Sequence, residues 1–101
     1  MATAASLIAA ALVILAVNGN WCKGANARTA GGRSCSALHP SATKFDMCGA
    51  LLKAKSNLGA SQKNLNDAML ILRGRIVGRS KDIEFANDKA VFANIAAFLA
   101  P

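Results

Sequence analysis

The sequence of 101 residues is poor in aromatic and acidic side chains. It contains no tyrosine, one tryptophan and four phenylalanines, and five Asp and Glu residues against twelve Lys and Arg. The scarcity of aromatics argues against the platforms that hold single-stranded nucleic acids, because bases stack there on successive aromatic rings. The five carboxylates are scattered along the chain, so no positioned pair for general acid/base catalysis is implied.

Motifs for metals and nucleotides are missing as well. Cys22, Cys35 and Cys48 are separated by twelve residues each, whereas zinc sites use close pairs such as C-x2-C. His39 has no Ser or Cys motif beside it, and the chain has neither a Walker loop nor the spaced glycines that hold a dinucleotide. The sequence therefore predicts a protein that is not an enzyme, with no catalytic residue, no metal site and no cofactor.

A long uncharged segment opens the chain. Residues 1–17 carry no charge, and the first charged side chain is Lys23. As a helix this segment is about 25 Å long, at the short end of what spans a bilayer. Trp21 suits the headgroup layer, and the cationic residues after it place the C-terminal part on the cytoplasmic or interior side. Residues 1–21 are therefore predicted as a single-pass membrane anchor, with Trp21 as its interfacial residue.

One side of this helix gathers mostly small side chains, which would let another helix approach closely in lipid. The residues predicted to form this packing stripe are Ala2, Ala5, Ala9, Val13 and Ala16. The alternative is that an apolar signal core is simply rich in alanine.

A cleavable signal peptide is the alternative to an anchor. The apolar core has a suitable length, and Ala25-Asn26-Ala27 has the small-x-small form of a cleavage site, but no basic segment precedes the core. Cleavage would give a secreted helical protein in which Cys35 and Cys48 remain as a pair able to form a disulfide. On the cytoplasmic side the same cysteines would remain thiols.

The remainder divides into a loop and a helical part. Residues 22–44 are rich in Gly, Asn, Ser and Thr without periodicity, which predicts an irregular basic loop. Residues 45–101 are predicted as a small helical domain of two or three amphipathic helices, with Gly59 ending the first and Ser61 capping the next. The predicted fold class is all-α, with an apolar membrane helix, a Gly-rich loop and these amphipathic helices.

Two apolar faces in the helical part are expected to pack against each other, because neither is long enough to span a membrane. The first face consists of Leu65, Met69, Leu72 and Ile76, and the second of Val91, Ile95, Phe98 and Leu99.

Basic residues concentrate in the middle of the chain. Between residues 18 and 81 there are eleven Lys and Arg against Asp46 and Asp67. Such a block is attracted to anionic lipid headgroups, to nucleic acid or to an acidic protein surface. The residues predicted to contact phosphate or an acidic partner are Lys53, Lys55, Lys63, Arg73, Arg75, Arg79 and Lys81. Without stacking platforms, any contact with nucleic acid would be made through backbone phosphates.

These features predict a non-enzymatic structural subunit of a membrane-bound or membrane-containing assembly, acting through helix packing and a basic face. In architecture alone, the chain resembles pilin-type subunits, small subunits of respiratory or photosynthetic complexes, and membrane proteins of lipid-containing viruses. No prepilin processing motif precedes the apolar helix. The expected partners are membrane lipid and other protein subunits. The alternatives are a secreted small helical protein and a nucleic-acid-binding protein that contacts the phosphate backbone.

Overall fold

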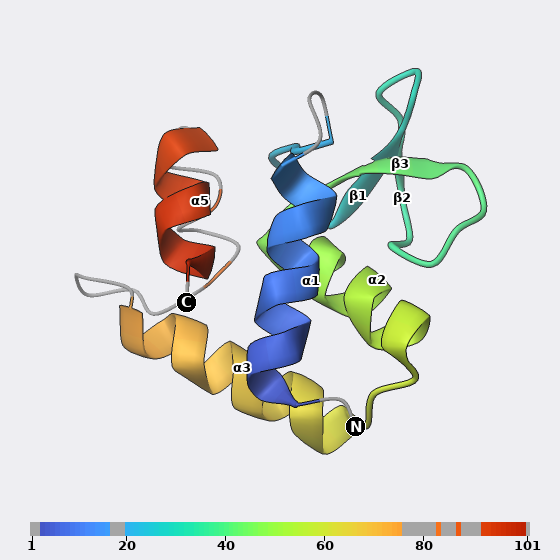
Figure 1. The fold of residues 1–101 in the computed structure, drawn as a ribbon. Helices are drawn as coiled ribbons and strands as arrows, with labels where there is room; N and C mark the ends of the chain where they lie inside the picture. Colours follow the sequence, from blue (N-terminus) through green and yellow to red (C-terminus); the bar gives the residue numbers. More distant parts are fainter. Residues whose placement is uncertain (1–2, 17–19, 76–82, 84–86, 88–91, 101) are drawn as a thin grey trace.

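A computed structural model describes residues 3–16, 20–75, 83, 87 and 92–100. The described elements follow the chain in the order α1 (Ala4–Ala16), β1 (Ala27–Thr29), β2 (Ser34–Cys35), β3 (Ala42–Phe45), α2 (Met47–Leu58), α3 (Gln62–Arg75) and α5 (Phe92–Leu99) (Figure 1). The fold is therefore mixed, with helices and a small sheet, and the prediction of an all-α protein is wrong.

The sheet lies in the segment that was predicted to be irregular. Its strand order is β2-β1-β3, and β1 is antiparallel to both neighbours. Ala27 is opposite Cys35 on one side and Phe45 on the other. Strands of two to four residues are too short to show the alternation of polar and apolar residues that identifies a strand in a sequence. The basic segment 22–44 is thus partly ordered as a sheet.

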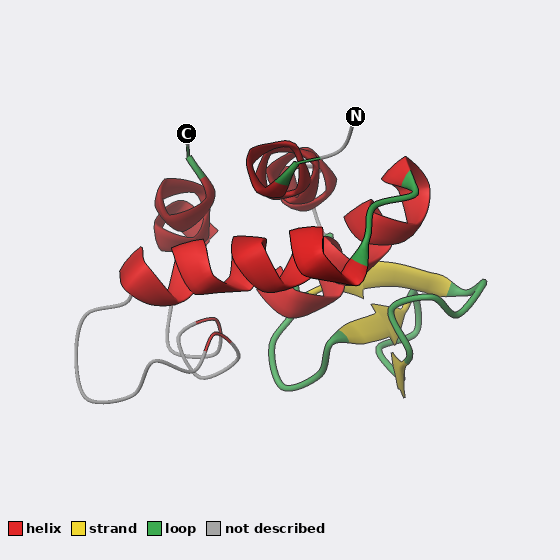
Figure 2. Ribbon diagram, turned by 90° about the horizontal axis from the view of Figure 1, so that it is seen from below, coloured by secondary structure: helices red, strands yellow, loops and turns green. Residues whose placement is uncertain are grey.

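The apolar helix α1 is the centre of the helical part. Its residues Leu7, Ile8, Ala11 and Leu15 are buried, and it packs against α2, α3 and α5. Figure 2 shows α1 and α5 nearly end-on and side by side, with α3 running across both. A helix with neighbours on several sides needs apolar residues at each contact, which accounts for its buried residues.

The predicted single-pass anchor does not fit this arrangement. Within the described ranges, no helix is both long and apolar enough to cross a membrane. The helix α1 has 13 residues, which gives a length of about 20 Å. A short central core helix and a short membrane span have the same composition, and here Leu7, Ile8, Ala11 and Leu15 of α1 are covered by protein.

The two faces predicted to pack together meet around α1. Leu65, Leu72, Ile95 and Leu99 are buried, and α5 contacts both α1 and α3. Met69 is half-buried against the same core. Ile76, Val91 and the side chain of Phe98 lie outside the described residues.

Both ends of α2 have capping groups that fix its position after the sheet. The carboxylate of Asp46 accepts a hydrogen bond from the backbone nitrogen of Gly49 at 2.6 Å, and Asp46 is itself buried. At the other end Gly59 adopts a left-handed conformation with φ of 63°, as the sequence predicts for a helix terminator. Ser61 and Asn64 then exchange side chain to backbone bonds at the start of α3, which confirms Ser61 as its cap.

Replacement of Asp46 by alanine should lower the free energy of unfolding by about 1–2 kcal/mol, because the buried Gly49 amide loses its acceptor. Asp46→Asn keeps an oxygen at the same place and is the matched control, with a smaller expected loss. Urea unfolding followed by the fluorescence of Trp21 measures both variants. Equal losses in the two variants would show that the charge of Asp46, not the cap, supplies the stability.

Candidate docking groove and basic hairpin

A groove of about 340 Å³ lies between α1, α3 and the end of α5. Its lining consists of seven apolar residues and one arginine, namely Ala5, Ile8, Ala9, Leu12, Val13, Ile71, Leu99 and Arg75. Val13 and Ile71 are the large apolar residues most open to solvent there, with 68% and 41% of their surface exposed. A volume of several hundred Å³ with an apolar lining and few polar groups is typical of a binding site.

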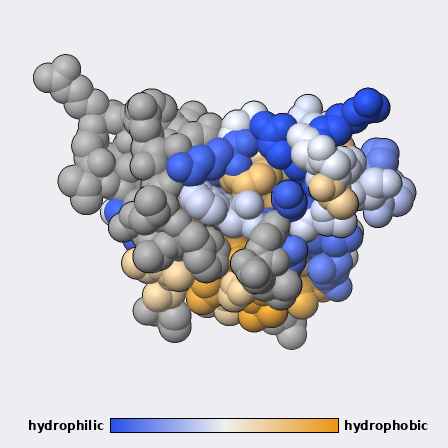
Figure 3. Space-filling view, turned by 90° about the horizontal axis from the view of Figure 1, so that it is seen from above, coloured by the Kyte–Doolittle hydropathy of each residue, from blue (hydrophilic) through white to orange (hydrophobic). Residues whose placement is uncertain are grey.

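The groove continues onto an exposed apolar side of α1. Ser6 is the only polar residue of this helix. Burial of one side therefore leaves another apolar side in contact with solvent. Figure 3 shows hydrophobic residues gathered along one edge of the molecule and hydrophilic residues along the opposite edge.

The stripe predicted for helix packing lies on this exposed side. Ala5, Ala9, Val13 and Ala16 are all exposed, and the first three line the groove. Ala2 lies outside the described residues. The stripe is therefore available for contact with another molecule.

Arg75 stands at the end of the groove next to α5. Its Nη1 donates a hydrogen bond to the carbonyl oxygen of Ala100 at 2.8 Å, and its side chain is exposed. This contact fixes the position of a positive charge beside an otherwise apolar lining.

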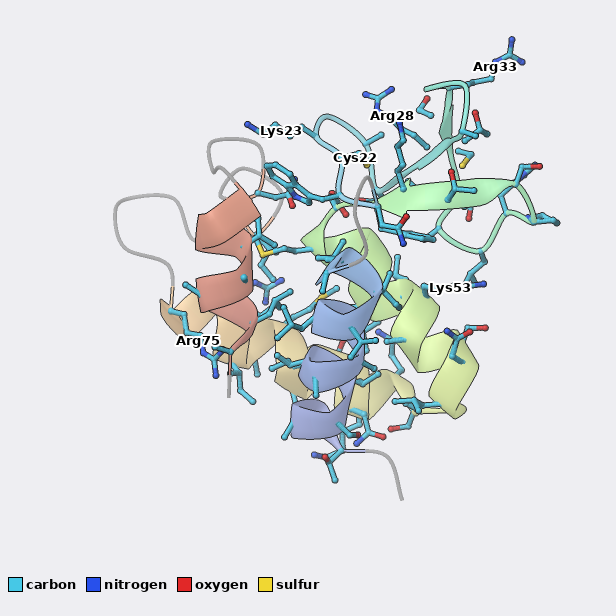
Figure 4. The ribbon with its side chains drawn as sticks, turned by 45° about the horizontal axis from the view of Figure 1, so that its top comes forward. Cys22, Lys23, Arg28, Arg33, Lys53 and Arg75 are labelled. Carbon is cyan, nitrogen blue, oxygen red and sulfur yellow. The ribbon has the colours of Figure 1, made fainter. Side chains whose placement is uncertain are left out.

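The structure does not gather the predicted phosphate-contacting residues on one face. Lys53 belongs to α2 and Arg75 to α3, and Figure 4 shows them on opposite sides of the molecule. Lys63 forms an ion pair of 2.8 Å with Asp67, and this hydrogen bond and the carboxylate charge raise the pKa of Lys63. Lys55 is half-buried on α2, and Arg73 is exposed on α3. Arg79 and Lys81 lie outside the described residues.

A different basic group, which we call the hairpin cluster, is formed at the sheet by Lys23, Arg28, Arg33 and Lys44. Arg28 is central, because its Nε and Nη2 donate to the carbonyl oxygen of Lys23 at 3.2 and 3.1 Å and its Nη1 donates to that of Gly32 at 2.9 Å. Lys44 lies directly opposite Arg28 in the sheet. The sequence offered one signal for this cluster, the run of cations after Trp21, which we attributed to the flank of a membrane helix.

Trp21 is anchored within the protein. Its Nε1 donates to Oδ1 of Asn87 at 2.8 Å. Asn87 is fully buried, and it also accepts from the backbone nitrogen of Met47 at 3.1 Å and donates to the carbonyl oxygen of Cys22 at 3.0 Å. The Nζ of Lys23 lies 5.2 Å from the centre of the indole ring. Trp21 therefore links the segment before the sheet to a residue more than sixty positions later.

Comparison with known proteins gives a family for this chain. Residues 1–98 match the family described as "Family of unknown function (DUF6197)". The chain belongs to this family. No curated protein and no solved structure matches it significantly.

In this DUF6197 member the described cysteines and histidine form neither a disulfide nor a metal centre. Cys22 and Cys48 are buried and Cys35 is half-buried, and no disulfide joins any two of them. His39 is exposed, and its Nδ1 accepts a hydrogen bond from the backbone nitrogen of Ser41 at 3.0 Å. Among the residues that the structure describes, no three His, Cys, Asp or Glu side chains are placed to hold a metal ion. The groove and the hairpin cluster are therefore the features on which functional proposals can be based.

Proposed function

We propose that this protein is a non-enzymatic subunit of a larger assembly and that it binds a neighbouring protein through the groove between α1, α3 and α5. The observation that carries the proposal is the open apolar groove, with Val13 and Ile71 exposed along it. Apolar side chains left open in this way are a common mark of a protein interface.

An amphipathic helix is the partner structure that suits the groove best. Helices bind in apolar grooves by inserting side chains spaced at i, i+3, i+4 and i+7. The small residues Ala5 and Ala9 in the wall allow the backbone of such a helix to come close. The length of α1, about 20 Å, provides a surface for three to four turns of the partner.

The charge of the protein favours an acidic partner. The formal net charge is +7, and Arg75 is the charged residue in the groove lining. The two carboxylates of the described chain are engaged elsewhere, since Asp46 caps α2 and Asp67 pairs with Lys63. An acidic helix would therefore be attracted over a distance, whereas a second copy of the chain would bring two strongly positive molecules together.

A lipid surface suits the groove less well. Proteins that lie on a membrane usually insert bulky or aromatic side chains, and the groove is lined by no aromatic residue. The alanines of α1 offer little apolar area for insertion into lipid. A protein partner is therefore the better-supported occupant, and lipid becomes an outcome of the test.

A designed peptide can test this proposal. The probe is a fluorescent amphipathic helix with Leu at i, i+3, i+4 and i+7 and Glu at the other positions, titrated with the full chain and followed by anisotropy. Val13→Glu should weaken its binding about tenfold or more, because a carboxylate would enter the apolar contact and repel the acidic probe.

Leu38→Glu is the matched control, because Leu38 is 56% exposed and lies outside the groove lining. It should leave the affinity close to that of the unmodified protein. Equal affinities for the unmodified protein and Val13→Glu would contradict the proposal. Sedimentation measures self-association, and flotation measures binding to vesicles. Self-association that Val13→Glu abolishes would assign the groove to a second copy of the chain, and vesicle binding that Val13→Glu abolishes would assign it to lipid.

A further inference from the structure

Arg28 is held in place by the backbone of two glycine-containing turns. Its guanidinium donates three hydrogen bonds, two to the carbonyl oxygen of Lys23 and one to that of Gly32. Gly24 and Gly32 adopt positive φ values of 77° and 90°, a conformation that favours glycine. An arginine has five N–H donors, so two N–H groups of Arg28 have no acceptor among the described residues.

Other basic residues lie on the segments next to this fixed guanidinium. Lys44 is directly opposite Arg28 in the antiparallel pair of β1 and β3, an arrangement of like charges that destabilises a sheet. The backbone of Arg33 is held across the turn between β1 and β2, because its carbonyl oxygen accepts a hydrogen bond from the backbone nitrogen of Thr29 at 2.8 Å. Neither carboxylate of the described ranges lies in the cluster, because Asp46 is buried at the cap of α2 and Asp67 pairs with Lys63 on α3.

We propose that the hairpin cluster, Lys23, Arg28, Arg33 and Lys44, binds the phosphate backbone of a double-stranded nucleic acid. Arginine is suited to phosphate because its planar fork presents paired donors to the phosphate oxygens. The three backbone contacts of Arg28 fix the guanidinium before binding, which lowers the entropy cost of ordering it. Lys23, Arg33 and Lys44 then supply neighbouring charges for successive phosphates.

The shape of the hairpin favours nucleic acid over a lipid surface. Figure 1 shows the turn between β1 and β2 projecting away from the helices, and Figure 4 shows Lys23, Arg28 and Arg33 along the same rim of the molecule. Residues 29–34 include no large apolar side chain that could enter lipid. The cluster is separate from the groove, so this inference does not depend on the proposed protein partner.

Salt-dependent binding of a short duplex DNA tests the inference. The full chain is titrated into a fluorescein-labelled duplex of mixed sequence at increasing salt. Four phosphate contacts predict a slope of log K against log salt of about −3.6, so that binding weakens about 150-fold between about 50 and 200 mM salt. The triple variant Lys23→Ala/Arg33→Ala/Lys44→Ala leaves Arg28 in place and should give a slope near −0.9, a loss of about fourfold over the same range.

The matched control removes the same charge elsewhere, with Lys53→Ala/Lys55→Ala/Arg73→Ala. It should keep a slope close to that of the unmodified protein, and circular dichroism verifies that both triple variants are folded. The same slope in the two triple variants, or no binding of the unmodified protein at about 50 mM salt, would overturn the inference. Binding to vesicles of phosphatidylglycerol and phosphatidylcholine without binding to DNA would overturn it in favour of lipid.

Discussion

Replacement of Gly49 by alanine is expected to lower the free energy of unfolding by about 3 kcal/mol or more. Gly49 lies in the first turn of α2, where a Cβ atom would come within 1.8 Å of the carbonyl oxygen of Asn26 and 2.8 Å of its carbonyl carbon. Both are backbone atoms, so no side-chain rotation relieves the overlap. The backbone at Asn26 is also held there, because its carbonyl oxygen accepts a hydrogen bond from the nitrogen of Asp46 at 3.1 Å. A small domain has a total stability of about 5–15 kcal/mol, so a large part of it should be lost.

Gly74→Ala is the matched control for this substitution. Gly74 lies within α3, and a Cβ atom there would meet nothing within 4 Å. Alanine has the higher helix propensity, so this variant should gain about 0.5–1 kcal/mol. Guanidinium unfolding followed by the fluorescence of Trp21 measures both. A loss at Gly49 below about 1 kcal/mol would mean that α2 can move away from Asn26, and that this close approach is not needed for the fold.

Asn87→Leu should cost about 3–6 kcal/mol. Asn87 is fully buried, and leucine has the same number of side-chain heavy atoms but no polar atoms. The substitution removes the partner of three groups, namely the indole nitrogen of Trp21, the backbone nitrogen of Met47 and the carbonyl oxygen of Cys22. Each buried polar group left without a partner costs about 1–3 kcal/mol.

Two measurements separate this effect from a general loss of stability. The fluorescence spectrum of Trp21 should change in the folded variant, since the indole loses its acceptor, and guanidinium unfolding gives the loss of free energy. Asn57→Leu on the exposed side of α2 is the control and should change the stability by less than about 0.5 kcal/mol. An unchanged spectrum together with a loss below about 1 kcal/mol would show that Asn87 is not a central contact of the core.

The helices could be located from the sequence, because their signals are local. Gly59 ends α2 and Ser61 caps α3 through their own backbone and side-chain geometry. The apolar run at the start of the chain likewise predicts the helix α1, but it does not predict whether lipid or protein surrounds this helix. An uninterrupted apolar helix is expected both in a membrane and at the centre of a helical core, and the choice depends on the neighbours α2, α3 and α5, which periodicity does not identify.

The sheet and the hairpin cluster could not be derived from local patterns. The strands have two to four residues each, and the turns on either side of β1 are held by Arg28, whose side chain contacts Lys23 and Gly32. The pairing of Arg28 with Lys44 links residues sixteen positions apart. Likewise, the groove combines α1, α3 and α5, so neither its lining nor the exposure of Val13 follows from any single segment.

The central position of α1 also affects the order in which this protein can fold during synthesis. The helix precedes all its partners in the sequence, since α2 begins at Met47, α3 at Gln62 and α5 at Phe92. Contacts between such distant segments form slowly, because a long loop must close first. While the ribosome adds the later residues, the apolar side chains of α1 have no complete cover and are available to chaperones or to other nascent chains. The core becomes complete only when α5 has been made, so the last helix of the described chain is the one that completes the cover of the core-facing side of α1.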